Sequence, residues 1–241
     1  MMLRKSSDRG YFEIDWLKSY HSFSFGEYHD PKFMGFSDLR VLNHDFVAPA
    51  SGFPKHPHRD MEIISYVLDG VIEHQDSMGN KAQIKAGEVQ VMSAGTGVFH
   101  SEYNPDPKKP FELIQIWILP EKQGLKPGYT QKEFRSADRK NQWQLLVSKN
   151  GEGESLRINQ DARIQAAVLS ENQSLQTELD SSRKYWLQVA KGEIEVFDPK
   201  SMHSLELEKG DAIGLQAGEW PDLKIKSGKE SEVLLFDLIN H

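Results

Sequence analysis

Apolar and polar residues alternate in short runs along most of this chain, and glycine or proline separates one run from the next. The clearest runs are residues 61–68 (MEIISYVL), 89–92 (VQVM) and 111–119 (FELIQIWIL). Alternation with a period of two predicts strands, because successive side chains of a strand leave opposite faces. Helical periodicity is scarce throughout. Many short strands at a spacing of roughly 8–12 residues predict an all-β protein built as a barrel or a sandwich.

The strand pattern is interrupted at residues 121–140, which are polar and contain proline and glycine. We interpret this stretch as a linker. Strands resume at residues 143–148. The sequence therefore predicts two domains, one over residues 1–120 and one over residues 141–241.

The spacing of glycines supports an internal repeat. The intervals are 17 and 8 residues in the first half and 18 and 8 in the second, with an offset between the halves of 122 to 123. The glycines concerned are Gly70, Gly87, Gly95, Gly192, Gly210 and Gly218. The two halves are therefore predicted to share one fold.

The composition is that of an ordinary globular protein, and it excludes several chemistries. Of the 241 residues, 38% are hydrophobic and 27% are charged, which is enough apolar material for a buried core. Cysteine is absent, which excludes disulfides, iron–sulfur clusters and thiol catalysis. The net charge of −7 argues against a general nucleic-acid binder. Without a recognisable signal peptide or a run of roughly 20 apolar residues, we expect a cytoplasmic protein that does not contact a membrane.

Two pairs of metal-capable side chains each skip one residue: His56 with His58, and His100 with Glu102. If each pair lies on a strand, both of its members leave the same face. Three imidazoles and one carboxylate then form a mononuclear metal site, with positions left free for a substrate or O₂ on an ion that prefers five or six ligands. These residue types do not choose among iron, manganese, cobalt, nickel and zinc.

Other polar residues compete with this set or lie beside it. Glu62 is four residues after His58 and keeps the same parity along an unbroken strand, so it is an alternative to Glu102 as the acidic ligand. A further interpretation makes Glu62 a partner that holds an imidazole in place. We interpret His74 as an ordinary strand histidine. Structural or pocket-edge positions are expected for His21, His29 and His44.

The repeat offset carries the two metal-capable pairs into the second half. The projected positions are Glu178 and Asp180 for the first pair, and Leu223 and Ile225 for the second. Two aliphatic side chains cannot bind a metal ion. We therefore expect the second half to lack this site and to be structural or a lid, with Glu178 and Asp180 in solvent.

Several longer segments are specific enough to indicate a family. They are HPHRDME at 56–62, EHQDSMGN at 73–80 and MSAGTGVFHSE at 92–102, with FSFG at 23–26 and MGF at 34–36 upstream. These segments closely resemble the pirin family. The resemblance is dense over the first 120 residues and loose beyond them.

Pirins belong to the cupin superfamily and have two β-barrel domains in one chain. The resemblance therefore implies a bicupin, with a metal-binding barrel at residues 1–120 and a degenerate barrel without a metal site at residues 141–241. It also implies a single divalent transition metal ion and favours Glu102 over Glu62 as its acidic ligand. By the matching motif positions, the implied ligands are His56, His58, His100 and Glu102.

Bacterial pirins that resemble this chain are quercetin 2,3-dioxygenases, which open the central ring of a flavonol with O₂ and release carbon monoxide. The resemblance implies that this chain is such an enzyme, acting on a flavonol such as quercetin or another enolic aromatic compound. Glu102 is then a ligand and also the catalytic base that takes the proton of the substrate hydroxyl. Four aromatic residues either line the substrate pocket or belong to the core: Phe23, Phe25, Phe33 and Phe36.

Two alternatives keep the same ligands. Animal pirins act as nuclear iron-dependent coregulators, so one alternative is a metal- or redox-sensing protein that acts through a protein partner. The other is a cupin isomerase or epimerase that turns over without O₂. A pocket that reaches the metal favours an enzyme, because a sensor can function with a closed site.

Overall fold

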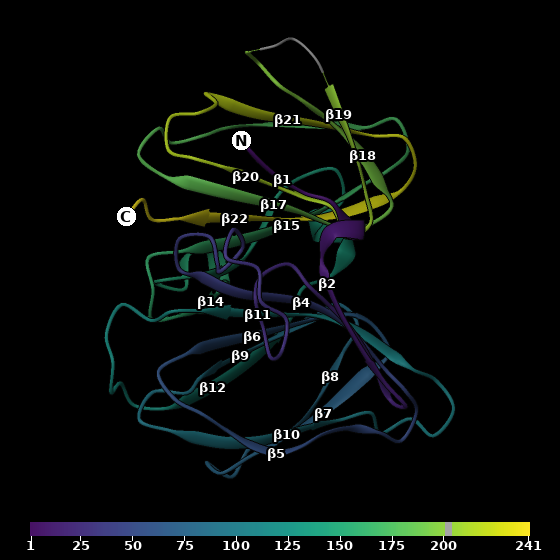
Figure 1. Ribbon diagram of the computed structural model, residues 1–241, viewed down its shortest axis with the longest axis vertical. Coiled ribbons are helices and arrows are strands. Elements are labelled where there is room, and N and C mark those ends of the chain that lie inside the picture. Colours follow the sequence, from purple (N-terminus) through teal and green to yellow (C-terminus); the bar gives the residue numbers. More distant parts are fainter. Residues whose placement is uncertain (201–203) are drawn as a thin grey trace. The chain divides into compact units, whose positions relative to one another are not determined.

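The computed structural model describes residues 1–200 and 204–241, and the regular secondary structure of this part of the chain is almost entirely strand (Figure 1). The strands group into two compact units. We call residues 10–134 and 156–160 the N-terminal barrel, and residues 1–9, 135–155 and 161–241 the C-terminal barrel. Short 3₁₀ helices occur at Ser6–Asp8, Ser136–Arg139 and Glu152–Glu154. The prediction of an all-β protein is confirmed.

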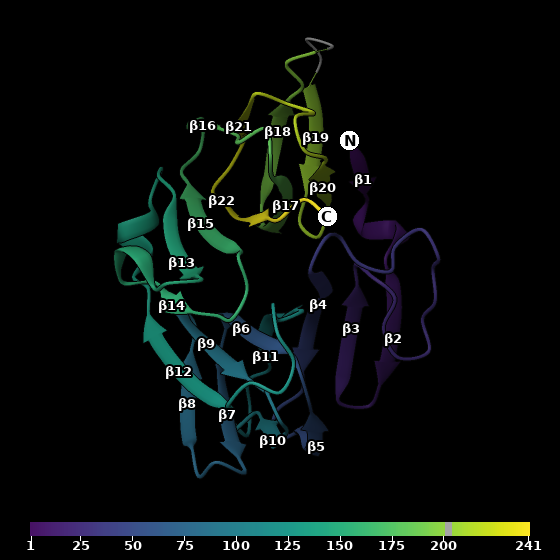
Figure 2. The same ribbon diagram turned by 90° about the vertical axis from the view of Figure 1, so that its left-hand side faces the viewer.

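The N-terminal barrel contains one large sheet and one small sheet. Its strands are β2 (Gly10–Ile14), β3 (Leu17–His21), β4 (Leu39–Val47), β5 (Gly52–His58), β6 (Glu62–Asp69), β7 (Val71–Asp76), β8 (Lys81–Lys85), β9 (Glu88–Ser93), β10 (Val98–Tyr103), β11 (Phe111–Ile118), β12 (Gly128–Glu133) and the two-residue β14 (Leu156–Arg157). The large sheet has the order β12-β9-β6-β11-β4-β3-β2 and the small sheet the order β5-β10-β7-β8. The edge strand β2 forms a hairpin with its neighbour β3 (Figure 2).

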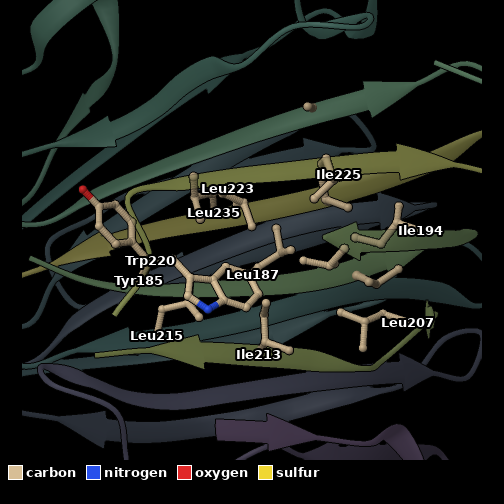
Figure 3. Close-up of a cluster of buried hydrophobic side chains, with 14 of the residues drawn as sticks. Tyr185, Leu187, Ile194, Leu207, Ile213, Leu215, Trp220, Leu223, Ile225 and Leu235 are labelled. Carbon is tan, nitrogen blue, oxygen red and sulfur yellow. The ribbon is translucent and has the colours of Figure 1, made fainter. Parts of the chain in front are cut away.

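The C-terminal barrel has the same two-sheet construction. Its strands are β1 (Met2–Arg4), β13 (Gln144–Ser148), β15 (Arg163–Leu169), β16 (Ser174–Glu178), β17 (Lys184–Lys191), β18 (Glu193–Phe197), β19 (Ser204–Glu208), β20 (Ala212–Leu215), β21 (Asp222–Ser227) and β22 (Ser231–Leu238). The strands that this unit contributes to the large sheet have the order β1-β20-β17-β22-β15-β13, and the small sheet has the order β16-β21-β18-β19. Apolar side chains fill its core, including Leu187 and Leu235 from the large sheet and Leu223 from the small sheet (Figure 3).

The sheet orders confirm the internal repeat. Strands β5, β10, β7 and β8 take the same places in one small sheet as β16, β21, β18 and β19 take in the other. The repeated glycines explain why the sequence showed it, because all of them have a positive φ, such as 78° at both Gly70 and Gly192. Side chains other than glycine rarely adopt this conformation, so the spacing of glycines records the spacing of turns.

Strand register corrects the projection of the first metal-capable pair onto the second half. His100 pairs with His56 in the N-terminal barrel, and Leu223 pairs with Thr177 in the C-terminal barrel. The counterpart of His56 is therefore Thr177, one residue before the predicted Glu178. Glu178 is exposed, and Leu223 and Ile225 are fully buried in the apolar core. Leu223 and Ile225 offer no ligand atom, and the absence of a metal site from this half stays a prediction.

The predicted linker at 121–140 needs correction, because residues 128–133 within it form β12. This strand pairs with β9 along its whole length, from Gly128 opposite Ser93 to Glu133 opposite Glu88. A polar strand at the edge of a sheet has a composition that resembles a linker, which is why the sequence was misleading. The first nine residues also differ from the predicted boundaries, because β1 pairs with β20 in the C-terminal barrel.

No helix in the described residues is both long and apolar enough to cross a membrane. The cytoplasmic location stays a prediction.

Asp45 on β4 is a carboxylate inside the N-terminal barrel, where only 4% of its surface is exposed. Ser19 Oγ on the neighbouring β3 donates a hydrogen bond to Asp45 Oδ1. Burial raises the pKa of Asp45 to about 7, and the negative charge of Glu102 acts in the same direction, while the hydrogen bond from Ser19 opposes them. The folded protein therefore retains a proton on Asp45 at pH values where the unfolded chain has lost it.

Replacing Ile225 with alanine should reduce the free energy of unfolding by about 2–5 kcal/mol, because it leaves a cavity in a fully packed core. Urea denaturation followed by tryptophan fluorescence measures the loss. Lys226→Ala, at an exposed position of the same strand, is the matched control and should change the value by no more than about 0.5 kcal/mol. Equal effects of the two substitutions would contradict the assignment of Ile225 to the core.

Replacing Asp45 with asparagine should stabilise the protein at pH 8 and have little effect near pH 4. Because the folded pKa is raised, the stability linked to Asp45 is complete below its unfolded pKa and is lost as the pH rises toward 7. Asparagine does not ionise. The difference in free energy of unfolding between the variant and the wild type should therefore grow by up to about 1.4 kcal/mol per pH unit between the unfolded and folded pKa values of Asp45. Urea denaturation of chelator-treated protein at both pH values measures it. A difference that is constant with pH would contradict the raised pKa.

Candidate metal centre

The paired strands β5 and β10 bring three imidazoles together. His56 and His58 lie on β5, and His100 on β10 is the direct cross-strand partner of His56. One nitrogen from each of the three rings lies within 4.8 Å of the other two. The skip-one spacing in the sequence therefore places these side chains on one face of the small sheet, as predicted.

Two nitrogens of this cluster face each other at close range. His56 Nε2 lies 3.0 Å from His100 Nε2, and His56 Nδ1 lies 2.7 Å from the carbonyl oxygen of Pro54. If Nδ1 carries the proton and donates to Pro54, the Nε2 lone pair of His56 points into the cluster. A separation of 3.0 Å suits two nitrogens that are each about 2.1 Å from one ion and meet at nearly a right angle.

His100 is held from behind by His74 and Asp76. His100 Nδ1 lies 3.4 Å from His74 Nδ1, and His74 Nε2 lies 3.2 Å from Asp76 Oδ2. Asn80 Nδ2 donates a 2.8 Å hydrogen bond to the same carboxylate oxygen. One arrangement of protons satisfies both contacts of His74: His74 donates to Asp76, and His100 donates to His74. His100 Nε2 then presents its lone pair to the cluster, so His74 orients a neighbouring ring instead of being an isolated strand histidine.

The environment keeps two of these imidazoles neutral. Burial, reinforced by the charges of the neighbouring histidines, lowers the pKa of His58 to about 3 and that of His100 to about 3. A protonated imidazole cannot bind a metal ion, and a neutral one can. Clustered neutral nitrogen donors therefore fit a transition metal ion.

Glu102 follows His100 on β10, and its side chain is almost completely buried. The register against β5 is irregular between these two residues. Glu102 Oε1 accepts a 3.2 Å hydrogen bond from Ser65 Oγ, and Oε2 accepts a 2.9 Å hydrogen bond from Gln115 Nε2. A carboxylate oxygen of Glu102 also lies within 4.8 Å of ring nitrogens of His74 and His100. The carboxylate is thus fixed beside the imidazoles by two groups of the large sheet.

Glu62, the alternative to Glu102 as the acidic group, does not lie beside the imidazoles. Strand β5 ends at His58 and β6 begins at Glu62, and the two strands belong to different sheets. The parity argument required an unbroken strand, which a left-handed Asp60 interrupts at φ 48°. Both carboxylate oxygens of Glu62 instead accept hydrogen bonds from Asn159, and Ser93 Oγ adds a third at 2.7 Å.

A cavity of about 760 Å³ within the N-terminal barrel reaches the cluster. Its lining includes His56, His58, Glu102 and Gln115. Apolar side chains make up much of the remaining wall: Phe12, Ile14, Trp16, Leu17, Phe25, Phe53 and Trp117. Such a chamber, mostly apolar with a few polar groups converging at one point, is typical of a site for a small molecule.

The other sequence candidates divide between the cavity and the core. Phe25 lines the cavity, whereas Phe23 and Phe36 are buried in the core. Phe33 is half-buried, and its backbone pairs with Ser24 and Asp30. Among the remaining histidines, His21 lines the cavity, His44 contacts Glu112 and His29 is exposed.

Ser65 and Gln115, which hold Glu102, were not identified from the sequence. They are direct cross-strand partners in the large sheet. A signal was present, because each residue is a polar position among apolar ones at the parity that faces the interior of the barrel. The sequence did not show which carboxylate they would meet, since that depends on how the two sheets pack.

Comparison with known proteins identifies the family of this chain. The family model described as pirin matches residues 3–118, and a model described as the quercetinase C-terminal cupin domain matches residues 145–238. The quercetin 2,3-dioxygenase of Escherichia coli K12 is 45% identical over 98% of this chain and 97% of its own length. A pirin-like protein of Caulobacter vibrioides is 39% identical over 98% of this chain and 99% of its own.

Solved structures agree with the fold. The bacterial pirin YhhW of Escherichia coli, in complex with nickel(II), superposes with a TM-score of 0.91 at 41% identity, covering 100% of this chain and 99% of that one. A quercetin 2,3-dioxygenase of Acinetobacter baumannii shares the fold at 19% identity, with a TM-score of 0.75 over 99% of this chain and 86% of that one. From its near full-length identity to such relatives and its two matching cupin models, the chain belongs to the pirin family.

Proposed function

We propose that this protein is a metal-dependent dioxygenase that opens the central ring of a flavonol, such as quercetin, with O₂ and releases carbon monoxide. The observation that carries the proposal is the cavity of about 760 Å³ that reaches His56, His58 and Glu102. Its volume and its largely apolar, aromatic wall suit a flat polyphenol. Relatives of similar length that carry the name quercetin 2,3-dioxygenase support the same reaction.

The residues proposed to hold one divalent transition metal ion are His56, His58, His100 and Glu102. The spacing of the three imidazole nitrogens and the lowered pKa values of His58 and His100 support this set. The nickel(II) complex of the related pirin supports a divalent ion. When bound, such an ion supplies a Lewis acid that makes the enolic hydroxyl of a flavonol easier to ionise.

The protein's own groups then have separate tasks. Glu102 accepts the proton of the substrate hydroxyl on a carboxylate oxygen, while Ser65 and Gln115 keep that carboxylate in place. His74, anchored on Asp76, fixes the orientation of the His100 ring. The aromatic wall excludes water from the electron-rich ring that reacts with O₂.

The cavity also bears on the alternatives. A sensor that acts through a protein partner has no need of a chamber that leads from the surface to the metal ligands, whereas an enzyme requires one. The proposed partners are therefore a small enolic aromatic substrate and O₂. An isomerase would use the same cavity, and turnover under nitrogen distinguishes it.

Loss of one imidazole should abolish the reaction. We expect His58→Ala to lower oxygen consumption with quercetin by at least about 100-fold in metal-loaded protein, because loss of even an outer partner of a ligand usually costs 10–100-fold. An oxygen electrode measures the rate. His29→Ala, at an exposed histidine, is the control and should stay within about twofold of the wild type. Equal rates in the wild type and His58→Ala would refute the proposal, and product formed under nitrogen would favour the isomerase.

Binding of a divalent ion should stabilise the fold. Adding Ni²⁺ to chelator-treated protein at about 100 times its dissociation constant contributes about 2.7 kcal/mol, which should raise the Tm by about 5–10 °C. We expect His100→Ala to lose most of this increase. Glu62→Gln should have a lower initial Tm, because Asn159 loses a charged partner, and should keep the increase. Differential scanning fluorimetry measures both variants, and an increase lost in Glu62→Gln but kept in His100→Ala would overturn the ligand set.

A further inference from the structure

We propose that a polar row on one wall of the cavity binds ring hydroxyl groups of the substrate, in addition to the enolic hydroxyl at the metal centre. We call Ser19, His21, Asn43 and Asp45 the hydroxyl row. The inference rests on the proposed function and narrows its substrate class to aromatic compounds that carry further hydroxyls on their rings. All four residues line the cavity.

The hydroxyl row continues the polar contacts that hold Glu102. Across the large sheet, Gln115 on β11 pairs with Asn43 on β4, and Asn43 pairs with His21 on β3. Neighbouring strands lie about 4.8 Å apart, so Asn43 is about 5 Å and His21 about 10 Å from Gln115 along this row. These steps match the width of one and two aromatic rings. A flat substrate anchored beside Glu102 therefore extends over Asn43.

Asn43 is a buried amide without a partner in the protein. Only 3% of its surface is exposed, and in the described residues neither amide atom forms a hydrogen bond with another protein group. Nearly all buried polar groups in folded proteins are hydrogen-bonded, and exceptions gather at functional sites. An amide that lines a cavity and lacks a protein partner is suited to a ligand that supplies one.

Asn104 shows how this chain satisfies a structural asparagine. It is as deeply buried as Asn43, with 2% of its surface exposed. Its Nδ2 donates to the carbonyl oxygens of Val47, Ala48 and Lys109, and its Oδ1 accepts from the backbone N–H of Asp106. The missing bonds of Asn43 are therefore not a general property of buried amides in this barrel. Asn43 lines the cavity, and its χ2 is a soft torsion, so its amide can rotate to meet a ligand there.

Asp45 and Ser19 provide the second part of the hydroxyl row. Ser19 Oγ donates to Asp45 Oδ1, and His21 Nε2 lies 2.8 Å from Ser19 Oγ, which fixes all three side chains. Asp45 Oδ2 makes no hydrogen bond with another protein group in the described chain, so it remains an acceptor for a phenolic O–H. The row thus offers a carboxyl oxygen next to an amide that can both donate and accept.

Aromatic side chains complete the slot around this row. Trp16 and Phe53 pack edge to face with their ring centroids 5.2 Å apart, and Phe25 and Trp117 pack in the same way with centroids 5.4 Å apart. Apolar faces with polar groups along one wall suit a flat ring system whose hydroxyls lie at its edge. An aliphatic substrate would leave the hydroxyl row without hydrogen-bond partners, and a strongly charged one would be poorly solvated by the aromatic side chains.

The test compares quercetin with 3-hydroxyflavone, which keeps the enolic hydroxyl and lacks the other ring hydroxyls. Binding to nickel-loaded protein is measured by isothermal titration calorimetry under nitrogen, so that no turnover occurs. We expect Asn43→Leu to weaken quercetin binding by about tenfold and to leave 3-hydroxyflavone binding within about threefold of the wild type. Equal effects on the two ligands, or no effect on either, would overturn the proposal.

Two further variants keep the test decisive. Ser22→Ala removes another buried oxygen without a protein partner, next to the row but outside the cavity lining, and should change neither affinity. Asn43→Ser shortens the side chain and keeps it polar, and it should show the same ligand-selective loss of affinity. It replaces Asn43→Leu in the test if the leucine variant fails to fold. A large fall in Tm for both Asn43 variants, without ligand selectivity, would assign Asn43 a structural role and reject the proposal.

Failure of the two proposals can be told apart. If wild-type protein binds quercetin selectively through Asn43 but consumes no O₂ with any flavonol, the dioxygenase proposal fails and the hydroxyl row stands. If the wild type consumes O₂ with quercetin and 3-hydroxyflavone in a ratio that Asn43→Leu does not change, the hydroxyl row fails and the dioxygenase proposal stands.

Discussion

The antiparallel pairing of β5 with β10 is the contact on which the site depends. It sets His100 directly opposite His56, and a slip of one residue would turn one set of rings to the opposite face of the sheet. Gly52 permits this pairing at the far end of β5, because a Cβ at this position would overlap the carbonyl oxygen of Glu102. A residue with no side chain therefore lets the two strands approach where the acidic group of the site is located.

The two barrels show that one topology supports either a polar or an apolar interior on the same sheet. In the C-terminal barrel, the paired strands β16 and β21 place Thr177 opposite Leu223, where the N-terminal barrel has two histidines. The aliphatic version adds to a continuous core, and its stability comes from burial. The imidazole version replaces apolar packing with polar rings, and burial lowers the pKa of His100, which keeps a nitrogen lone pair available. One copy thus serves packing, and the other retains a chemical site.

Support for the site comes from a sheet that does not itself carry the imidazoles. Gln115 and Ser65 belong to the large sheet and hold Glu102 of the small sheet, so the carboxylate is positioned by the packing of one sheet on the other. The same inward-facing row continues through Asn43 to His21. A single line of cross-strand neighbours therefore links the candidate metal centre to the wall of the cavity.

The sequence alone determined the features that depend on local spacing. Alternation with a period of two gave the strands, and glycines at turns with positive φ revealed the repeat. Skip-one spacing placed His56 with His58 on one face, and the motifs of the first half identified the family. The tertiary structure decided whatever depends on contacts between distant segments. It separated Glu62 from the imidazoles and joined His74 to His100. It also showed that part of the predicted linker is strand β12. The sequence could not show these features, because cross-strand register and the packing of two sheets depend on the whole barrel and produce no periodic pattern within a single strand.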